Sequence, residues 1–87
     1  MLKVWTDEAW DDYLFWQKQD RRIVKRINEL LKDIDRNGNA GIDKPEPVKY
    51  EFSSYWSRRI DAEHRLVYQV DEVGRKVTIV SCPNEKP

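Results

Sequence analysis

This 87-residue chain lacks several features that would place it in common protein classes. Its single cysteine, Cys82, excludes an intramolecular disulfide and is typical of a reducing compartment. No apolar run approaches the roughly 18 residues of a membrane span, and the first residues show no signal-peptide pattern. We therefore expect a cytoplasmic protein that does not contact a membrane.

Net charge and metal-binding motifs are also missing. Sixteen basic and 16 acidic residues cancel, so the net charge gives no sign of a nucleic-acid partner. His64 is the only histidine, and we find no metal-ligand cluster, glycine-rich phosphate loop or Ser-His-Asp set. We expect neither a metal nor a cofactor.

Two amphipathic helices are predicted in the first half of the chain, after a short strand at residues 2–5. Thr6 or Asp7 can cap the first helix, and Asp20 can cap the second. The predicted packed side of the first helix is formed by Trp10, Tyr13, Leu14 and Gln17, and Ala9, Phe15 and Trp16 widen this apolar side. That of the second is formed by Ile23, Ile27, Leu30, Leu31 and Ile34. So short a link predicts an antiparallel helical hairpin.

Basic residues gather on the second helix. Residues 18–36 hold seven basic and four acidic residues, whereas residues 1–17 hold one basic and four acidic. The predicted outer side carries Arg21, Arg22, Lys25, Arg26 and Lys32. Two interpretations stay open: a solvated helix face, which is the commoner one, or contact with RNA phosphate.

Strands dominate the second half, at residues 48–52, 55–60, 64–70 and 76–82. Their alternation of apolar and polar residues predicts one face packed on the helices and one polar face. Two prolines hold the backbone around Glu46 extended. The predicted fold class is α+β, in one domain spanning residues 1–87. In it, two helices pack on a mainly antiparallel, four- to five-stranded twisted sheet.

The arginines of the predicted strands at residues 55–60 and 64–70 are expected to lie on different faces of the sheet. If the hairpin closes around residues 61–63, antiparallel pairing sets Arg59 opposite Arg65. Two like charges so placed are destabilising unless both point into water or share an anion. Arg58 alternates to the packed face, so we predict a structural role for it.

Five segments together resemble one family. They are WTDEAWDDYLFWQ (5–17), RIVKRINELLKDI (22–34), GIDKPEP (41–47), YWSRRID (55–61) and EHRLVY (63–68). They are similar to the YoeB toxins of bacterial toxin–antitoxin pairs, within the RelE-like group of small ribonucleases. The resemblance runs from about residue 2 to Cys82 and implies the same RelE-like, microbial ribonuclease-type fold.

The resemblance also implies metal-independent cleavage of mRNA in the A site of the 70S ribosome. Such cleavage needs a base for the 2′-OH, cations for the phosphorane and an acid for the leaving 5′-oxygen. Glu46 matches the family's base, and Lys49, Arg59 and Arg65 match its phosphate-binding residues. Without the resemblance, Glu46 would be a solvated loop charge, and Arg59 and Arg65 ordinary sheet-surface charges.

The C-terminus departs from the family pattern. Family members end in His-Tyr, which supplies the leaving-group acid and a group that stacks on or orients the nucleotide. Glu85 and Lys86 stand at these two positions here. An unperturbed glutamate, with a pKa of about 4.3, is protonated in about one molecule in 500 at neutral pH. Alternation turns His64 away from Arg65, so we predict a hydrogen-bonded turn histidine there.

Two functions are compatible with this sequence. The first is a ribosome-dependent mRNA endonuclease, weakened by its altered terminus. The resemblance implies that a YefM-like antitoxin silences it and brings it indirectly to operator DNA; a homodimer is a further option. The second is a binding module that engages the antitoxin without cleaving RNA, with the ribosome as a further option. Only the basic helix supports a plain RNA-binding domain.

Overall fold

The computed structural model describes residues 1–38, 46–47, 55–71 and 73–82, with residues 46–47 described by their backbone alone. The elements are β1 (Leu2–Trp5), α1 (Asp7–Gln19), α2 (Arg21–Asn37), β2 (Glu46–Pro47), β3 (Tyr55–Arg59), β4 (Arg65–Asp71) and β5 (Lys76–Ser81). The five strands form one sheet in the order β1-β5-β4-β3-β2. Only the β1–β5 pair among these strands is parallel.

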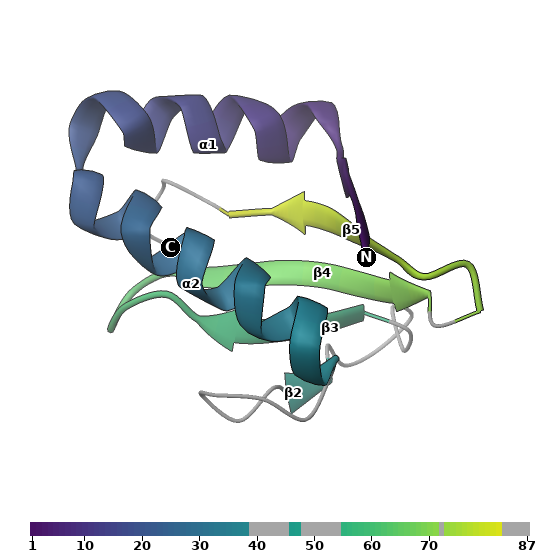
Figure 1. Cartoon of the computed structure of the whole chain (residues 1–87). Helices are drawn as coiled ribbons and strands as arrows, with labels where there is room; N and C mark the ends of the chain where they lie inside the picture. Colours follow the sequence, from purple (N-terminus) through teal and green to yellow (C-terminus); the bar gives the residue numbers. More distant parts are fainter. Residues whose placement is uncertain (39–45, 48–54, 72, 83–87) are drawn as a thin grey trace.

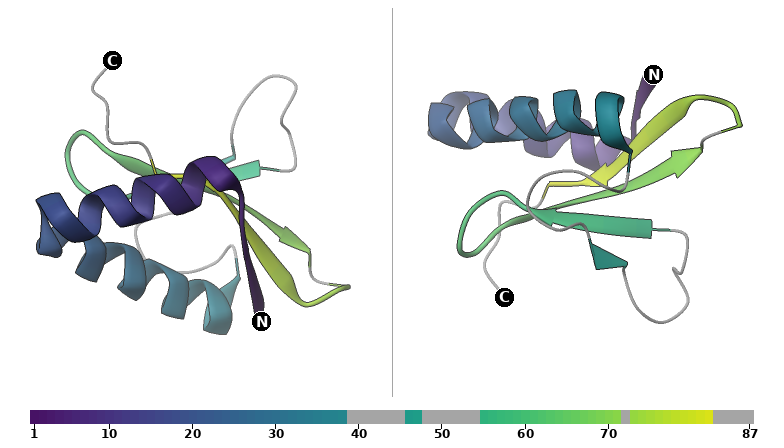
Figure 2. Two further views of the ribbon diagram at one scale, coloured as in Figure 1. Left: turned by 90° about the horizontal axis from the view of Figure 1, so that it is seen from above. Right: turned by 60° about the horizontal axis from the view of Figure 1, so that its bottom comes forward.

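Both helices cover the same face of this sheet, and no helix of the described residues lies on the opposite face, which is called the open side below (Figure 1, Figure 2). The predicted α+β class and the mainly antiparallel sheet are confirmed. The predicted strand at residues 48–52 lies outside the described residues, whereas the extended backbone predicted around Glu46 is confirmed as β2. None of the helices in the described ranges is long and apolar enough to cross a membrane.

Capping side chains explain where the helices begin. The Thr6 hydroxyl accepts a hydrogen bond from the Ala9 N–H at 3.1 Å, and the Asp20 carboxylate accepts one from the Arg22 N–H at 3.0 Å. Asp20 is the only residue between the two helices, so the chain turns back at once, as predicted. Gly38 ends α2 with a φ of 56°, a conformation that favours glycine.

The hydrophobic core confirms one predicted helix face and part of the other. All five residues of the α2 stripe are buried, and α1 buries Ala9 and Trp16, two of the residues predicted to widen its apolar side. Trp10 and Leu14, predicted on the packed side, are 46% and 39% exposed. Helix α1 has aromatic residues around much of its circumference, so spacing did not define one face. Trp10 packs instead against the Trp5 ring of β1, 5.8 Å away between centroids.

Candidate functional site

The side chains of β3 and β4 divide between the helix side and the open side of the sheet. Leu66 and Tyr68 are fully buried in the core beneath the helices. Arg58 lies on the same side, because its guanidinium contacts Asp33 of α2. Since successive strand residues alternate, Ser57, Arg59 and Arg65 lie on the open side.

Arg58 is a structural residue, as predicted. It is fully buried, forms an ion pair with Asp33 and donates a hydrogen bond to the Gly38 carbonyl at the end of α2. Its Nε also donates to the Tyr68 hydroxyl at 3.0 Å. Burial raises the pKa of Tyr68, although the Arg58 hydrogen bond opposes this rise. The phenol therefore stays neutral at physiological pH, and Asp33 carries the negative charge that compensates Arg58.

The two predicted phosphate-binding arginines of the hairpin lie on the open side. Arg59 pairs directly opposite Arg65, which confirms the predicted register. Arg59 is exposed, whereas Arg65 is half-buried and donates from Nε to the Ser57 hydroxyl oxygen at 3.1 Å. The backbone of Glu46 in β2 pairs opposite Ser57. Strands β2, β3 and β4 therefore bring residues 46, 59 and 65 to one region of the sheet.

Three other residues of the predicted site lie outside the described part of the chain. They are Lys49, Glu85 and Lys86, and the side chain of Glu46 is likewise not described. The roles assigned to these residues stay predictions. No group of three or more His, Cys, Asp or Glu side chains among the described residues could hold a metal ion.

The only histidine of the chain faces the helices, as predicted. His64 Nδ1 lies 2.8 Å from Asp61 Oδ1, and its ring packs edge-on against Trp16 of α1 with centroids 4.9 Å apart. Burial alone would raise the pKa of Asp61, but backbone hydrogen bonds from Glu63 and His64 and the His64 ring outweigh it and lower that pKa. The imidazole is thus held in the turn, on the face opposite Arg65.

The end of β5 is held by α1, a contact that sequence reasoning missed. The Cys82 N–H donates to the Asp12 carboxylate at 3.2 Å, and its carbonyl accepts from Trp16 Nε1 at 3.0 Å. Burial, and next the charge of Asp12, raise the pKa of the Cys82 thiol to about 12. The thiol is therefore neutral and unreactive at physiological pH, as expected for a small apolar residue. No local pattern signals a contact between residues this far apart.

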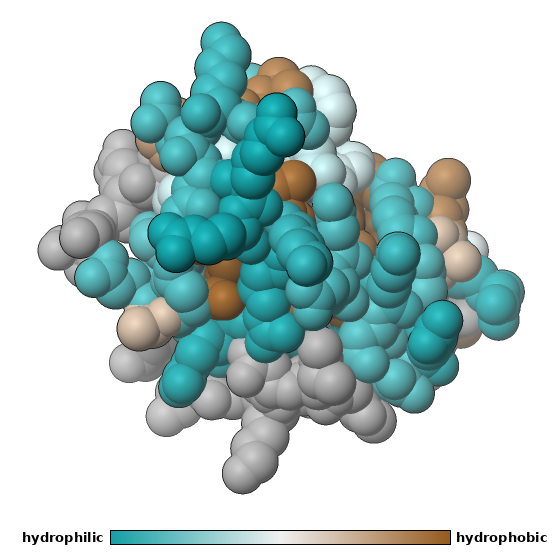
Figure 3. Space-filling view, turned by 60° about the vertical axis from the view of Figure 1, so that its left-hand side comes forward, coloured by the Kyte–Doolittle hydropathy of each residue, from teal (hydrophilic) through white to brown (hydrophobic). Residues whose placement is uncertain are grey.

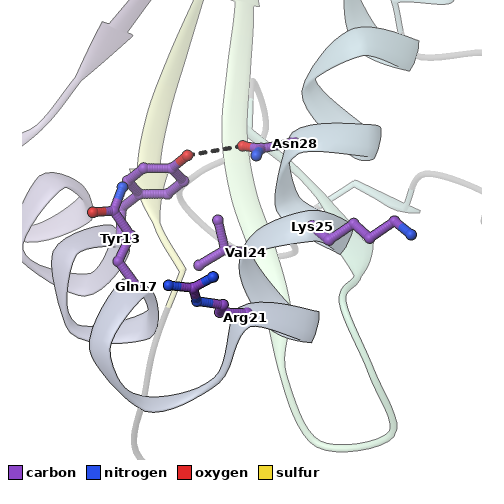
Figure 4. Close-up of a pocket in the computed structure, with 6 residues that line it drawn as sticks. All are labelled: Tyr13, Gln17, Arg21, Val24, Lys25 and Asn28. Atoms are coloured by element: carbon purple, nitrogen blue, oxygen red, sulfur yellow. Dashed lines mark hydrogen bonds between the residues drawn. The ribbon is translucent and has the colours of Figure 1, made fainter.

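A groove of about 500 Å³ lies in the helical layer, away from the paired arginines (Figure 4). It is lined by Tyr13, Gln17, Arg21, Val24, Lys25 and Asn28. The Tyr13 hydroxyl donates to Asn28 Oδ1 at 2.9 Å across it, which links the two helices. The surface where α1 turns into α2 is mainly hydrophilic (Figure 3). A solvated face accounts for these charges without any ligand.

One predicted outer residue of α2 is turned inward. Arg26 is half-buried, and its Nη2 donates to the backbone carbonyl of Arg59 at 3.4 Å. Arg26 therefore contributes only part of its side chain to the basic surface of α2. The rest connects the helix to the end of β3.

The family model described as "YoeB-like toxin of bacterial type II toxin-antitoxin system" matches residues 5–85. The chain belongs to this family. Toxin YoeB of Escherichia coli K12 is 57% identical over 72 residues, which cover 83% of this chain and 86% of that protein. The residues matched by the family model include both helices, the β3–β4 hairpin and Glu46.

Solved structures agree with this family and with the fold. A YoeB/ParE toxin from Agrobacterium tumefaciens superposes with a TM-score of 0.89 at 49% identity, covering 94% of this chain and 95% of that chain. A YoeB dimer from Staphylococcus aureus also gives 0.89 at 46% identity, covering 98% and 97%. A YoeB–YefM complex from the same organism gives 0.87 at 46% identity, covering 98% of both chains.

Proposed function

We propose that this chain is the toxin of a type II toxin–antitoxin pair and a metal-independent endoribonuclease that cleaves mRNA in the A site of the 70S ribosome. The observation that carries the proposal is the pairing of Arg59 with Arg65 on the open side of the sheet. Two like charges in direct opposition are unfavourable unless water or an anion separates them. A phosphodiester supplies such an anion.

The chemistry assigns one role to each predicted residue. Glu46 takes the proton of the 2′-OH, and the 2′-oxygen attacks the adjacent phosphorus. Arg59, Arg65 and Lys49 stabilise the negative charge of the phosphorane. The bond to the 5′-oxygen then breaks, and an acid protonates that oxygen. The products are a 2′,3′-cyclic phosphate and a 5′-hydroxyl.

This chain lacks the family's general acid for the leaving 5′-oxygen, because Glu85 and Lys86 replace the family's His-Tyr pair. A positioned general acid contributes about 10²–10⁴-fold to a rate. We therefore expect this chain to cleave at least about 100-fold more slowly than a version carrying Pro83→Arg, Glu85→His and Lys86→Tyr, called the grafted chain below. His64 is a poor substitute, since it faces α1 rather than the paired arginines.

Single-turnover cleavage of mRNA on a programmed ribosome by both versions tests the proposal. The grafted chain should cut faster and should be toxic when expressed without an antitoxin. Equal rates would show that another group donates the proton. If neither version cuts mRNA that the ribosome holds, cleavage is not the activity of this domain.

A second candidate function follows from the same altered terminus. In it, the chain binds its antitoxin without turnover, with the ribosome as a further option. The S. aureus YoeB–YefM complex and YoeB dimer support a YefM-like antitoxin and self-association as partners in either case. Contact with operator DNA would then come through the antitoxin, in the cytoplasm. Co-purification with a YefM-like protein, together with absent cleavage, would favour this alternative.

A further inference from the structure

Ser57 lies where three strands meet. It belongs to β3, and its backbone pairs with Glu46 of β2 on one side and with Val67 of β4 on the other. The residue is 9% exposed and lies on the open side of the sheet. Its hydroxyl oxygen accepts the hydrogen bond from Arg65 Nε at 3.1 Å. A cation from β4 is thus tied to the residue of β3 that pairs with Glu46.

The direction of this bond matters for the site. The residue directly opposite Arg65 is Arg59, a like charge that disfavours a guanidinium placed between the two strands. The bond to Ser57 instead runs diagonally across the hairpin, two residues along β3 from Arg59 and toward the position that pairs with β2. The guanidinium makes this bond through Nε.

The geometry points to Ser57 as the residue that positions Arg65 for the scissile phosphate, next to the strand that carries Glu46. This inference rests on the proposed function. Ser57 touches no reacting atom in the scheme, so it is a positioning residue and not a catalytic one. Without its hydroxyl, the flexible Arg65 side chain loses a charge-assisted hydrogen bond and samples more orientations.

Cleavage by the grafted chain gives the first test, because its rate is expected to be measurable. Ser57→Ala should lower the single-turnover rate at saturating protein by about 10-fold or more, and Ser57→Thr, which keeps the hydroxyl, should restore most of it. Thr78→Ala removes a hydroxyl from the open side of β5 and should leave the rate unchanged. In an Arg65→Ala background, Ser57→Ala should cause no further loss. Losses that multiply would overturn the inference.

The Arg65 Nε–H signal in ¹⁵N NMR spectra gives a second test that does not depend on activity. The unaltered chain should show a slowly exchanging signal that Arg65→Lys removes and that Ser57→Ala shifts or broadens. An unchanged signal in Ser57→Ala would overturn the inference. A grafted chain that retains Ser57 and does not cleave would instead overturn the proposed function. In that case, the NMR signal alone would test whether Ser57 positions Arg65.

Discussion

The two sides of the β3–β4 hairpin use the same residue type in opposite ways. On the helix side, Arg58 is fully buried and its charge is compensated by Asp33. One residue further along, Arg59 is exposed and faces another cation, Arg65. Burial makes a partner obligatory for the first arginine, whereas water or an anion can satisfy the others. Strand alternation alone therefore separates a structural arginine from the pair that we propose binds phosphate.

Removing the buried arginine should have the largest effect. Arg58→Ala leaves Asp33 and the Gly38 carbonyl without the cation, and breaking a buried ion pair costs about 3–5 kcal/mol of unfolding free energy. Arg59→Ala, the matched control on the other side, should change it by no more than about 0.5 kcal/mol. Urea denaturation of both variants measures the difference. Similar midpoints would mean that alternation does not separate the two roles.

Removing an arginine of the open side should affect cleavage and leave the fold intact. Arg65→Ala in the grafted chain should lower the single-turnover rate by about 10²–10³-fold, because a charged donor to the phosphorane is lost. Its unfolding midpoint should change little. Arg58→Ala, assayed where it is fully folded, should cleave faster than Arg65→Ala. Equal rates for these two variants would contradict the assigned register.

Measuring stability as a function of pH should show whether the Cys82 thiol is buried from water on the helix side of the sheet. The pKa of this thiol is raised from 9.0 to about 12, so the folded state favours the protonated form. Between these two values the unfolded chain releases the proton and the folded chain keeps it. Stability should therefore fall as pH rises through this window. Cys82→Ala should show a shallower decline; identical slopes would mean that the thiol is not buried in solution.

Reversing one charge of the Arg59–Arg65 pair should have the smallest effect on stability. Arg59→Glu places an opposite charge across from Arg65, and such a cross-strand pair is worth about 0.2–1 kcal/mol. The variant should be slightly more stable than the parent and should lose cleavage in the grafted chain. Arg59→Ala should fall between them in stability. A less stable Arg59→Glu would show that Arg59 already has a stabilising role in the sheet.

Short-range patterns predicted much of the fold and part of the site. Three predicted features depend on residues that are close in sequence. They are the apolar stripe of α2, the caps at Thr6 and Asp20, and the pairing of Arg59 with Arg65. The packed side of α1 was predicted less well, because Trp10 and Leu14 share their apolar character with residues on several sides of the helix. Hydrophobic spacing defines a face only where the other faces are polar.

The sequence by itself determined the helical hairpin, the strand register and the division of arginines between two faces, because capping, periodicity and antiparallel pairing are local rules. Only the tertiary structure decided which side chains compensate Arg58 and which hold Cys82. It also placed β1 parallel to β5 and Ser57 between Glu46 and Arg65. The contacts of Arg58 with α2, of Cys82 with α1 and of β1 with β5 join segments that are distant in sequence. The Ser57–Arg65 bond lies within one hairpin, but it depends on how the two side chains pack, which no local pattern encodes.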